Sequence, residues 1–228
     1  MKIRLFITIV LIITFSSCID KMLGERYVQI IKTSQRTIEK WYEVDGLFNH
    51  FPKSVSSKSV VQMQYSIPGN MTDKEWNRYI ADCYLILNAG DNDETLYPDS
   101  FLYKTDYKEN NFIIDFAFKF YTQLDTLKVR NFALPNIYPI PYFESFDFGL
   151  GDVEEKYWYE PGVEMVSNKY NIPEDLEVFV FKAGHGDYWK VKCDIMRPET
   201  LGQWKNGYSS GVAISKNHNM IVYWMMAW

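Results

Sequence analysis

The spacing of hydrophobic residues predicts a long helix near the start of the chain. Between residues 19 and 45, apolar residues recur at intervals of three and four, which places them on one face of a helix. Gly46 and Pro52 end this pattern. The opposite face carries basic residues one turn apart, and we interpret it as a solvated edge, with contact to lipid headgroups as the alternative. The apolar stripe consists of Leu23, Tyr27, Ile30, Ile31, Ser34, Ile38 and Trp41.

A second helix is predicted after a short strand. Val60–Ile67 alternates between apolar and polar residues, which indicates a strand. Thr72 and Glu75 then form a capping-box pattern, in which a hydroxyl group precedes a glutamate by three residues. The helix that they open would end near Asn88. Its apolar face would be made of Trp76, Tyr79, Ile80, Cys83 and Leu87.

From Phe101 onwards the pattern changes to a period of two, which is typical of β-strands. Met220–Trp228 is apolar at both alternating sets of positions, so this strand should be buried on both sides. Ala183–Asp187 is a good hairpin connection between two strand-like runs. The proline- and aromatic-rich stretch Leu134–Gly151 is predicted to be an ordered loop, a crossing or a partner-binding segment. The other predicted strands are Phe101–Tyr107, Phe112–Phe120, Leu127–Phe132, Leu176–Lys182, Tyr188–Asp194 and Val212–Ser215.

Together these elements predict an α+β fold, with two N-terminal helices packed on a mostly antiparallel β-sheet region. Residues 1–17 are predicted to be an export signal, and residues 18–228 a single domain of sufficient length to bury a core. A hydrophobic fraction of 47% and an aromatic fraction of 17% argue against a disordered chain.

Charge argues against a nucleic-acid partner. The formal net charge is −5, and loss of the two basic residues in the signal would move it to −7, because that segment contains no acid. An acidic surface does not attract a phosphate backbone.

The first eighteen residues resemble the signal of a bacterial lipoprotein. Lys2 and Arg4 precede the apolar run Leu5–Phe15, and small residues lead to Cys18. The sequence Phe-Ser-Ser-Cys is similar to a lipobox, and this resemblance implies that Cys18 carries a diacylglycerol and becomes the acylated first residue, with fatty acids such as palmitate. The alternatives are a transmembrane anchor, for which the run is short of about 20 apolar residues, and a secreted protein with a chance cysteine.

The C-terminal stretch Trp204–Trp228 resembles the ending of uncharacterised exported lipoproteins of Bacteroidota. The resemblance lies in a Gly-Tyr-Ser-x-Gly run and a Tyr-Trp-rich last strand, and it implies an origin and a location but no activity. The residues that carry it are Gly207, Tyr208, Ser209, Gly211, Val212, Ala213, Tyr223, Trp224 and Trp228.

A run of acids beside aromatic residues is the candidate ligand-binding patch. Aromatic rings provide flat apolar faces and carboxylates accept hydrogen bonds from hydroxyl groups, so this combination would suit a sugar. The alternative is a strand or loop whose rings turn inward. The patch comprises Asp152, Glu154, Glu155, Tyr157, Trp158 and Tyr159.

Few residues suggest catalysis or metal binding. The chain contains three histidines, at positions 50, 185 and 218, and none belongs to a known metal or nucleophile motif. His185 and Asp187 could form an acid–base pair, but a structural histidine is the simpler interpretation. The acidic run Asp91–Glu94 lacks the glycine and glutamate of an EF-hand loop, which favours a solvated turn.

Cys83 and Cys193 are an even pair in an exported chain, so they could form a disulfide. Two buried thiols are the interpretation that we favour.

The sequence thus predicts a lipid-anchored protein of the cell envelope, with no metal or cofactor. We expect it on the outer membrane facing the periplasm, with an envelope protein or a glycan as partner. A non-catalytic binding or structural module is the first hypothesis, and a protein that binds or hydrolyses glycans is the second.

Overall fold

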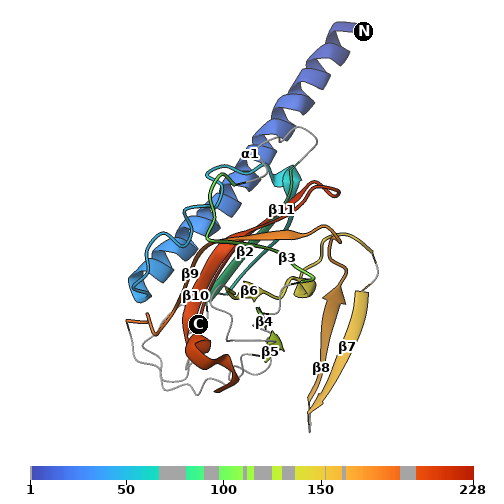
Figure 1. Ribbon diagram of the computed structural model, residues 1–228. Coiled ribbons are helices and arrows are strands. Elements are labelled where there is room, and N and C mark those ends of the chain that lie inside the picture. Colours follow the sequence, from blue (N-terminus) through green and yellow to red (C-terminus); the bar gives the residue numbers. More distant parts are fainter. Residues whose placement is uncertain are drawn as a thin grey trace.

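The computed structural model describes residues 2–66, 81–89, 98–109, 112–115, 125–129, 137–151, 153–160, 163–190 and 199–228 (Figure 1). Within these residues the fold consists of one α-helix, α1 (Lys2–Trp41), together with strands and short 3-10 helices. The main element is a six-stranded sheet with the order β1-β2-β11-β10-β9-β3, in which every pair is antiparallel. Its strands are β1 (Val60–Ser66), β2 (Ala81–Asn88), β3 (Tyr103–Asp106), β9 (Glu177–His185), β10 (Gly207–Ser215) and β11 (Met220–Ala227).

Two smaller sheets complete the described fold. β4 (Phe112–Asp115) pairs with β5 (Asp125–Val129) and with β6 (Ile140–Pro141). β7 (Val153–Glu160) and β8 (Val163–Tyr170) form a separate antiparallel hairpin, seen beside the main sheet in Figure 1. The 3-10 helices are η1 (Ser57–Ser59), η2 (Phe143–Ser145) and η3 (Glu199–Lys205).

The predicted α+β fold with two N-terminal helices is wrong, because the structure is mostly β. Residues 72–80 of the expected second helix lie outside the described residues, and Ala81–Asn88 forms strand β2 instead. Six consecutive residues of β2 are buried, since the strand pairs with β1 and β11 and both of its faces are covered. A short apolar run of this kind fits a helix and a central strand equally well.

The predicted hairpin turn at Ala183–Asp187 is also replaced by a strand. β9 continues to His185 and pairs with β10 along its length. Gly184 lies opposite Tyr208, and a Cβ atom on Gly184 would approach that ring to 2.8 Å. This glycine therefore makes space for a tyrosine. The strand expected at Tyr188–Asp194 was to be the partner across that turn. Trp189 forms an isolated bridge with Tyr42 instead, and residues 191–194 lie outside the described part of the chain.

Helix α1 covers one face of the main sheet. Its buried residues Ile31 and Ile38 pack with Leu85 of β2 and Met225 of β11. Tyr42, just after the helix, is fully buried, and its hydroxyl donates a hydrogen bond to the Gly207 carbonyl at 2.9 Å. Of the hydrophobic stripe predicted from the sequence, Ile31, Ser34 and Ile38 are buried, whereas Leu23 is exposed.

The opposite face of the sheet is covered by the segment around η2 and β6. Tyr84 and Trp224 belong to the same buried cluster as Ile113, Ile140 and Phe143. β11 is therefore buried on both faces, as its sequence predicts. The main sheet therefore lies between two layers, with α1 on one face and the small β4–β6 sheet with η2 on the other.

The N-terminal part of α1 is fixed to the loop that precedes β1. Asp20 accepts hydrogen bonds from the hydroxyl groups of Ser57, at 2.5 Å, and Ser56, at 3.2 Å. The Ser57 hydrogen bond is the main cause that lowers the pKa of Asp20. Gly24 packs against the Val55 carbonyl, and a Cβ atom there would collide with that oxygen. The helix is thereby held to the domain from Asp20 onwards.

One carboxyl group is buried in the sheet without a full set of hydrogen bonds. Asp82 in β2 is 4% exposed, and no described residue bonds to its Oδ1. Burial raises the pKa of Asp82 to about 7, and a backbone hydrogen bond from Ser66 offsets only part of that effect.

We expect Asp82→Asn to stabilise the protein at neutral pH. The carboxyl group ionises near pH 3.8 in the unfolded chain but only near pH 7 in the folded one. Asp82 therefore does not reduce folding stability below pH 3.8, and its destabilising contribution grows as pH rises to 7, to roughly 4 kcal/mol at about 1.4 kcal/mol per pH unit. Urea unfolding at pH 4.5 and pH 7.5 should show a stability difference between the variant and the wild type that grows with pH.

The exposed Asp99 provides the matched control, because Asp99→Asn removes one surface charge. An equal pH dependence for the wild type and Asp82→Asn would show that the Asp82 carboxyl is ionised in the folded protein.

Candidate functional site

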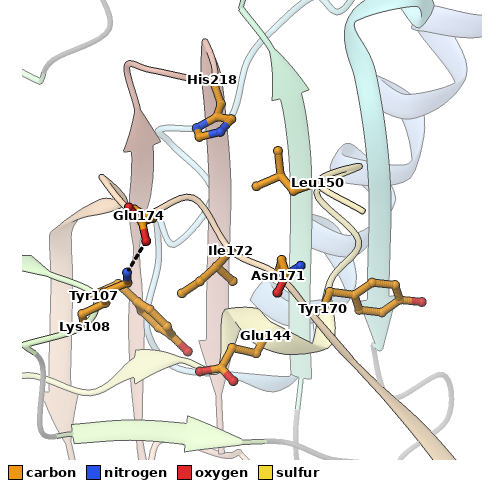
Figure 2. Close-up of a pocket in the computed structure, with 9 residues that line it drawn as sticks. All are labelled: Tyr107, Lys108, Glu144, Leu150, Tyr170, Asn171, Ile172, Glu174 and His218. Carbon is orange, nitrogen blue, oxygen red and sulfur yellow. Dashed lines mark hydrogen bonds and ion pairs between the residues drawn. The ribbon is translucent and has the colours of Figure 1, made fainter. Parts of the chain in front are cut away.

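A cleft of about 530 Å³ lies at the base of the β7–β8 hairpin (Figure 2). Four segments that are distant in the sequence contribute to it. They are the turn after β3, η2 with the residues that follow it, the connection from β8 to β9, and the turn between β10 and β11. The cleft is lined by Tyr107, Lys108, Glu144, Leu150, Tyr170, Asn171, Ile172, Glu174 and His218.

Tyr107 forms a rigid part of the cleft wall. It is 1% exposed, and its hydroxyl accepts a hydrogen bond from the Phe143 backbone at 3.1 Å. Its own backbone N–H donates to the Leu176 carbonyl at 3.0 Å. The β3 turn, η2 and the start of β9 are joined through this one residue, so the cleft is largely preformed.

Charged side chains surround the cleft. Lys108 and Glu174 form an ion pair at 3.5 Å, visible as the dashed line in Figure 2, and both side chains are largely exposed. Such an exposed pair contributes little to stability, so either charge can exchange its partner for a ligand. Glu144 accepts a hydrogen bond from the Tyr142 hydroxyl at 3.2 Å, which orients its carboxylate.

His218 belongs to a network that connects two walls of the cleft. The Ser215 hydroxyl donates to Asp175 at 2.6 Å and lies 3.1 Å from Nδ1 of His218. The backbone N–H of Asn217 donates to the same carboxylate at 2.8 Å. Burial tends to raise the pKa of Asp175, but these hydrogen bonds outweigh it and hold the pKa below its ordinary value.

The Ser215, His218 and Asp175 side chains do not have the arrangement of a hydrolase triad. Ser215 is fully buried, and its hydroxyl is bonded directly to the carboxylate, without the histidine in between. A nucleophile must reach its substrate and transfer its proton to a base. The network therefore fixes the β10–β11 turn against the β8–β9 connection.

The other two histidines lie elsewhere. His50 donates from Nε2 to the Trp224 carbonyl at 3.0 Å, and burial lowers its pKa to about 4. The His185 ring packs against Trp204 with 5.6 Å between ring centroids. Asp187 accepts a hydrogen bond from the backbone of Trp189 at 3.2 Å, so its carboxylate stabilises the chain after β9.

The predicted acidic–aromatic patch lies on β7. Val153, at the start of β7, pairs with Tyr170, which lines the cleft, so the patch begins at the edge of the cleft. Glu154, Glu155, Tyr157, Trp158 and Tyr159 all belong to β7, which pairs with β8 along its whole length. Asp152 lies outside the described residues. Ligand binding by these residues stays a prediction.

Cys18 lies within the backbone of α1, two residues before Asp20. Across the residues that the structure describes, no helix combines the length and the hydropathy needed to cross a membrane. The lipidation of Cys18 stays a prediction.

Cys83 is a free thiol in β2, and burial raises its pKa. Cys193 and the acidic run Asp91–Glu94 fall outside the described ranges. Within those ranges, no group of three His, Cys, Asp or Glu side chains is placed to hold a metal ion.

No family profile, curated protein sequence or solved structure matches the chain, so the comparisons assign it to no family. The cleft, the hairpin and the start of α1 are therefore the features from which a function can be argued.

We expect Ser215→Ala to destabilise the fold and loosen the His218 side of the cleft. A buried hydrogen bond to a charged group contributes about 1.5–3 kcal/mol, and its loss leaves a carboxylate without one donor. Urea unfolding measures the effect, with Ser59→Ala as control, because Ser59 donates a hydrogen bond at an exposed site. Equal stability of the two variants would show that the Ser215 network does not stabilise the turn.

Proposed function

We propose that this chain is a lipid-anchored protein of the cell envelope whose domain, residues 18–228, binds a ligand without catalysing a reaction. The cleft at the base of the β7–β8 hairpin carries the proposal. Its walls come from four segments that are joined by buried hydrogen bonds, so a ligand would meet a preformed surface. The proposed anchor is Cys18, and the proposed location is the outer membrane, facing the periplasm.

The cleft offers both polar and apolar contacts. Lys108, Asn171 and His218 can donate hydrogen bonds, and Glu144 and Glu174 can accept them. Leu150, Tyr170 and Ile172 provide apolar surface between these groups, as Figure 2 shows. Pockets that bind small molecules commonly combine these features.

A glycan is the ligand class that this lining favours, which makes a glycan-binding or glycan-hydrolysing lipoprotein the second candidate. Sugar hydroxyl groups need donors and acceptors at close spacing, and sugar rings have apolar faces that pack on aromatic and aliphatic side chains.

We expect Cys18→Ala to convert a membrane-bound protein into a soluble one. The thiol is the proposed site of acylation, and two or more acyl chains hold a protein firmly at a membrane. Cell fractionation with immunodetection measures the distribution, and protease treatment of intact cells tests which side the domain faces.

Cys83→Ala is the control, because that thiol is fully buried in the sheet and should not affect the distribution. Membrane association of Cys18→Ala, with the signal region still attached, would contradict acylation and support an uncleaved anchor.

We expect Glu144→Gln to weaken glycan binding at least tenfold. The carboxylate would accept hydrogen bonds from sugar hydroxyl groups, and a hydrogen bond to a charged group contributes about 1.5–3 kcal/mol. Calorimetric titration with a panel of neutral oligosaccharides and peptidoglycan fragments measures the change.

Glu109→Gln is the matched control, because Glu109 lies exposed in the β3 turn but does not line the cleft. If a panel member binds the wild type and both variants equally, its site is not this cleft.

A further inference from the structure

The first turns of α1 after Cys18 expose apolar side chains to solvent. Ile19 is 44% exposed, Met22 is 61% exposed and Leu23 is 39% exposed. Residues three and four apart lie on the same face of a helix, so these three side chains form one apolar surface. Soluble domains rarely leave a group of large apolar side chains uncovered next to one another without a partner.

This apolar surface ends abruptly along the helix. Along the same face towards the C-terminus lie Arg26, Gln29 and Thr33, which are exposed, and Ile30, which is only partly exposed. The side of α1 that packs on the sheet is a different one, formed by Val28, Ile31 and Ile38. The apolar surface is therefore confined to residues 19–23, directly after the proposed acylation site.

The helix and the domain are joined without a flexible spacer. Asp20 is already bonded to Ser56 and Ser57, and Gly24 is in close contact with Val55. A lipid on Cys18 would thus lie two residues from the first contact between α1 and the body of the protein. The orientation of the domain at a membrane would follow from the direction of α1.

We infer that the exposed surface of Ile19, Met22 and Leu23 inserts into the lipid bilayer next to the acylated Cys18. This inference rests on the proposed lipid anchor and adds the contact that orients the domain. An interfacial helix lies along the membrane surface with its apolar face buried about 5–10 Å at the boundary between headgroups and acyl chains, which this short apolar surface could reach. The first polar position of that face, Arg26, would then lie at the headgroups.

Basic side chains surround the apolar surface. Lys21 and Arg26 are exposed on α1. Lys58 is exposed on η1, and the backbone N–H of Lys58 donates a hydrogen bond to Asp20. Asp20 and the exposed Glu25 are the acids at this end of the molecule, and hydrogen bonds from the η1 loop keep Asp20 ionised, so the two acids offset two of these three positive charges. Each lysine or arginine near an anionic membrane surface contributes about 1 kcal/mol of attraction.

The same arrangement determines what faces away from the membrane. In Figure 1 the β7–β8 hairpin lies at the opposite end of the molecule from the N-terminal end of α1, whose residues up to 17 form the proposed signal. With the start of α1 in the bilayer, the hairpin and the cleft at its base are presented to the aqueous compartment.

The test uses the acylated protein in vesicles of phosphatidylethanolamine and phosphatidylglycerol, with a nitroxide on Met22→Cys or on Gln29→Cys. These positions lie two turns apart on the same face of α1. Both proteins carry Cys193→Ser, and Cys83 is buried and will not react. We expect the label at position 22 to collide several-fold more often with oxygen, and several-fold less often with a water-soluble nickel chelate, than the label at position 29.

Equal access of the nickel chelate to both labels in vesicle-bound protein would overturn the inserted surface and leave the lipid anchor in place. Failure of the protein to float with vesicles would overturn the anchor and the inserted surface together. Because Met22 and Gln29 are exposed, both labelled proteins should keep the wild-type urea midpoint, which confirms that the comparison is made on folded protein.

Discussion

The burial of β11 on both faces is the constraint on which the rest of the fold depends. Trp224 and Met225 are adjacent in the sequence and both are fully buried. Trp224 belongs to the hydrophobic cluster that includes η2, and Met225 belongs to the cluster that includes α1. Burying a large apolar side chain contributes about 1.5–3 kcal/mol, so a strand of this composition requires a cover on each side. α1 is one cover, and the segment from β4 to η2 is the other. The cleft exists because the second cover ends at the base of the hairpin.

Elements whose residues fit only a period of two could be predicted from the sequence, whereas an element whose residues also fit a helical spacing could not. β1 and β11 show period-two patterns and lie where they were expected. β2 does not, because Cys83 and Leu87 satisfy the four-residue spacing of a helix while the whole run from Ala81 to Ile86 is apolar enough for a central strand. Only pairing with β1 and β11, which are distant in sequence, decides between these two structures.

The cleft could not be predicted, because no segment of it has a local signature. Tyr107 resembles any strand residue, and Glu144 lies in a stretch whose prolines predict only an irregular course. Their proximity depends on a hydrogen bond between the Tyr107 hydroxyl and the Phe143 backbone, which connects positions 36 residues apart. The acidic and aromatic run was visible in the sequence as a composition, and the structure places residues 153–159 of it on one strand, β7.

The strand order has a consequence for how the chain acquires its structure. The sheet centre is formed by β10 and β11, from residues 207–227, whereas β1 and β2 come from residues 60–88. β2 can pair on its inner side only with β11, so the N-terminal helix and strands have no complete surface to pack on until the last strand has been synthesised. Folds dominated by such long-range pairing form slowly, because loop closure precedes the contacts that stabilise it. The main sheet can therefore be completed only at the end of synthesis, when β11 becomes available to join β2 to β10.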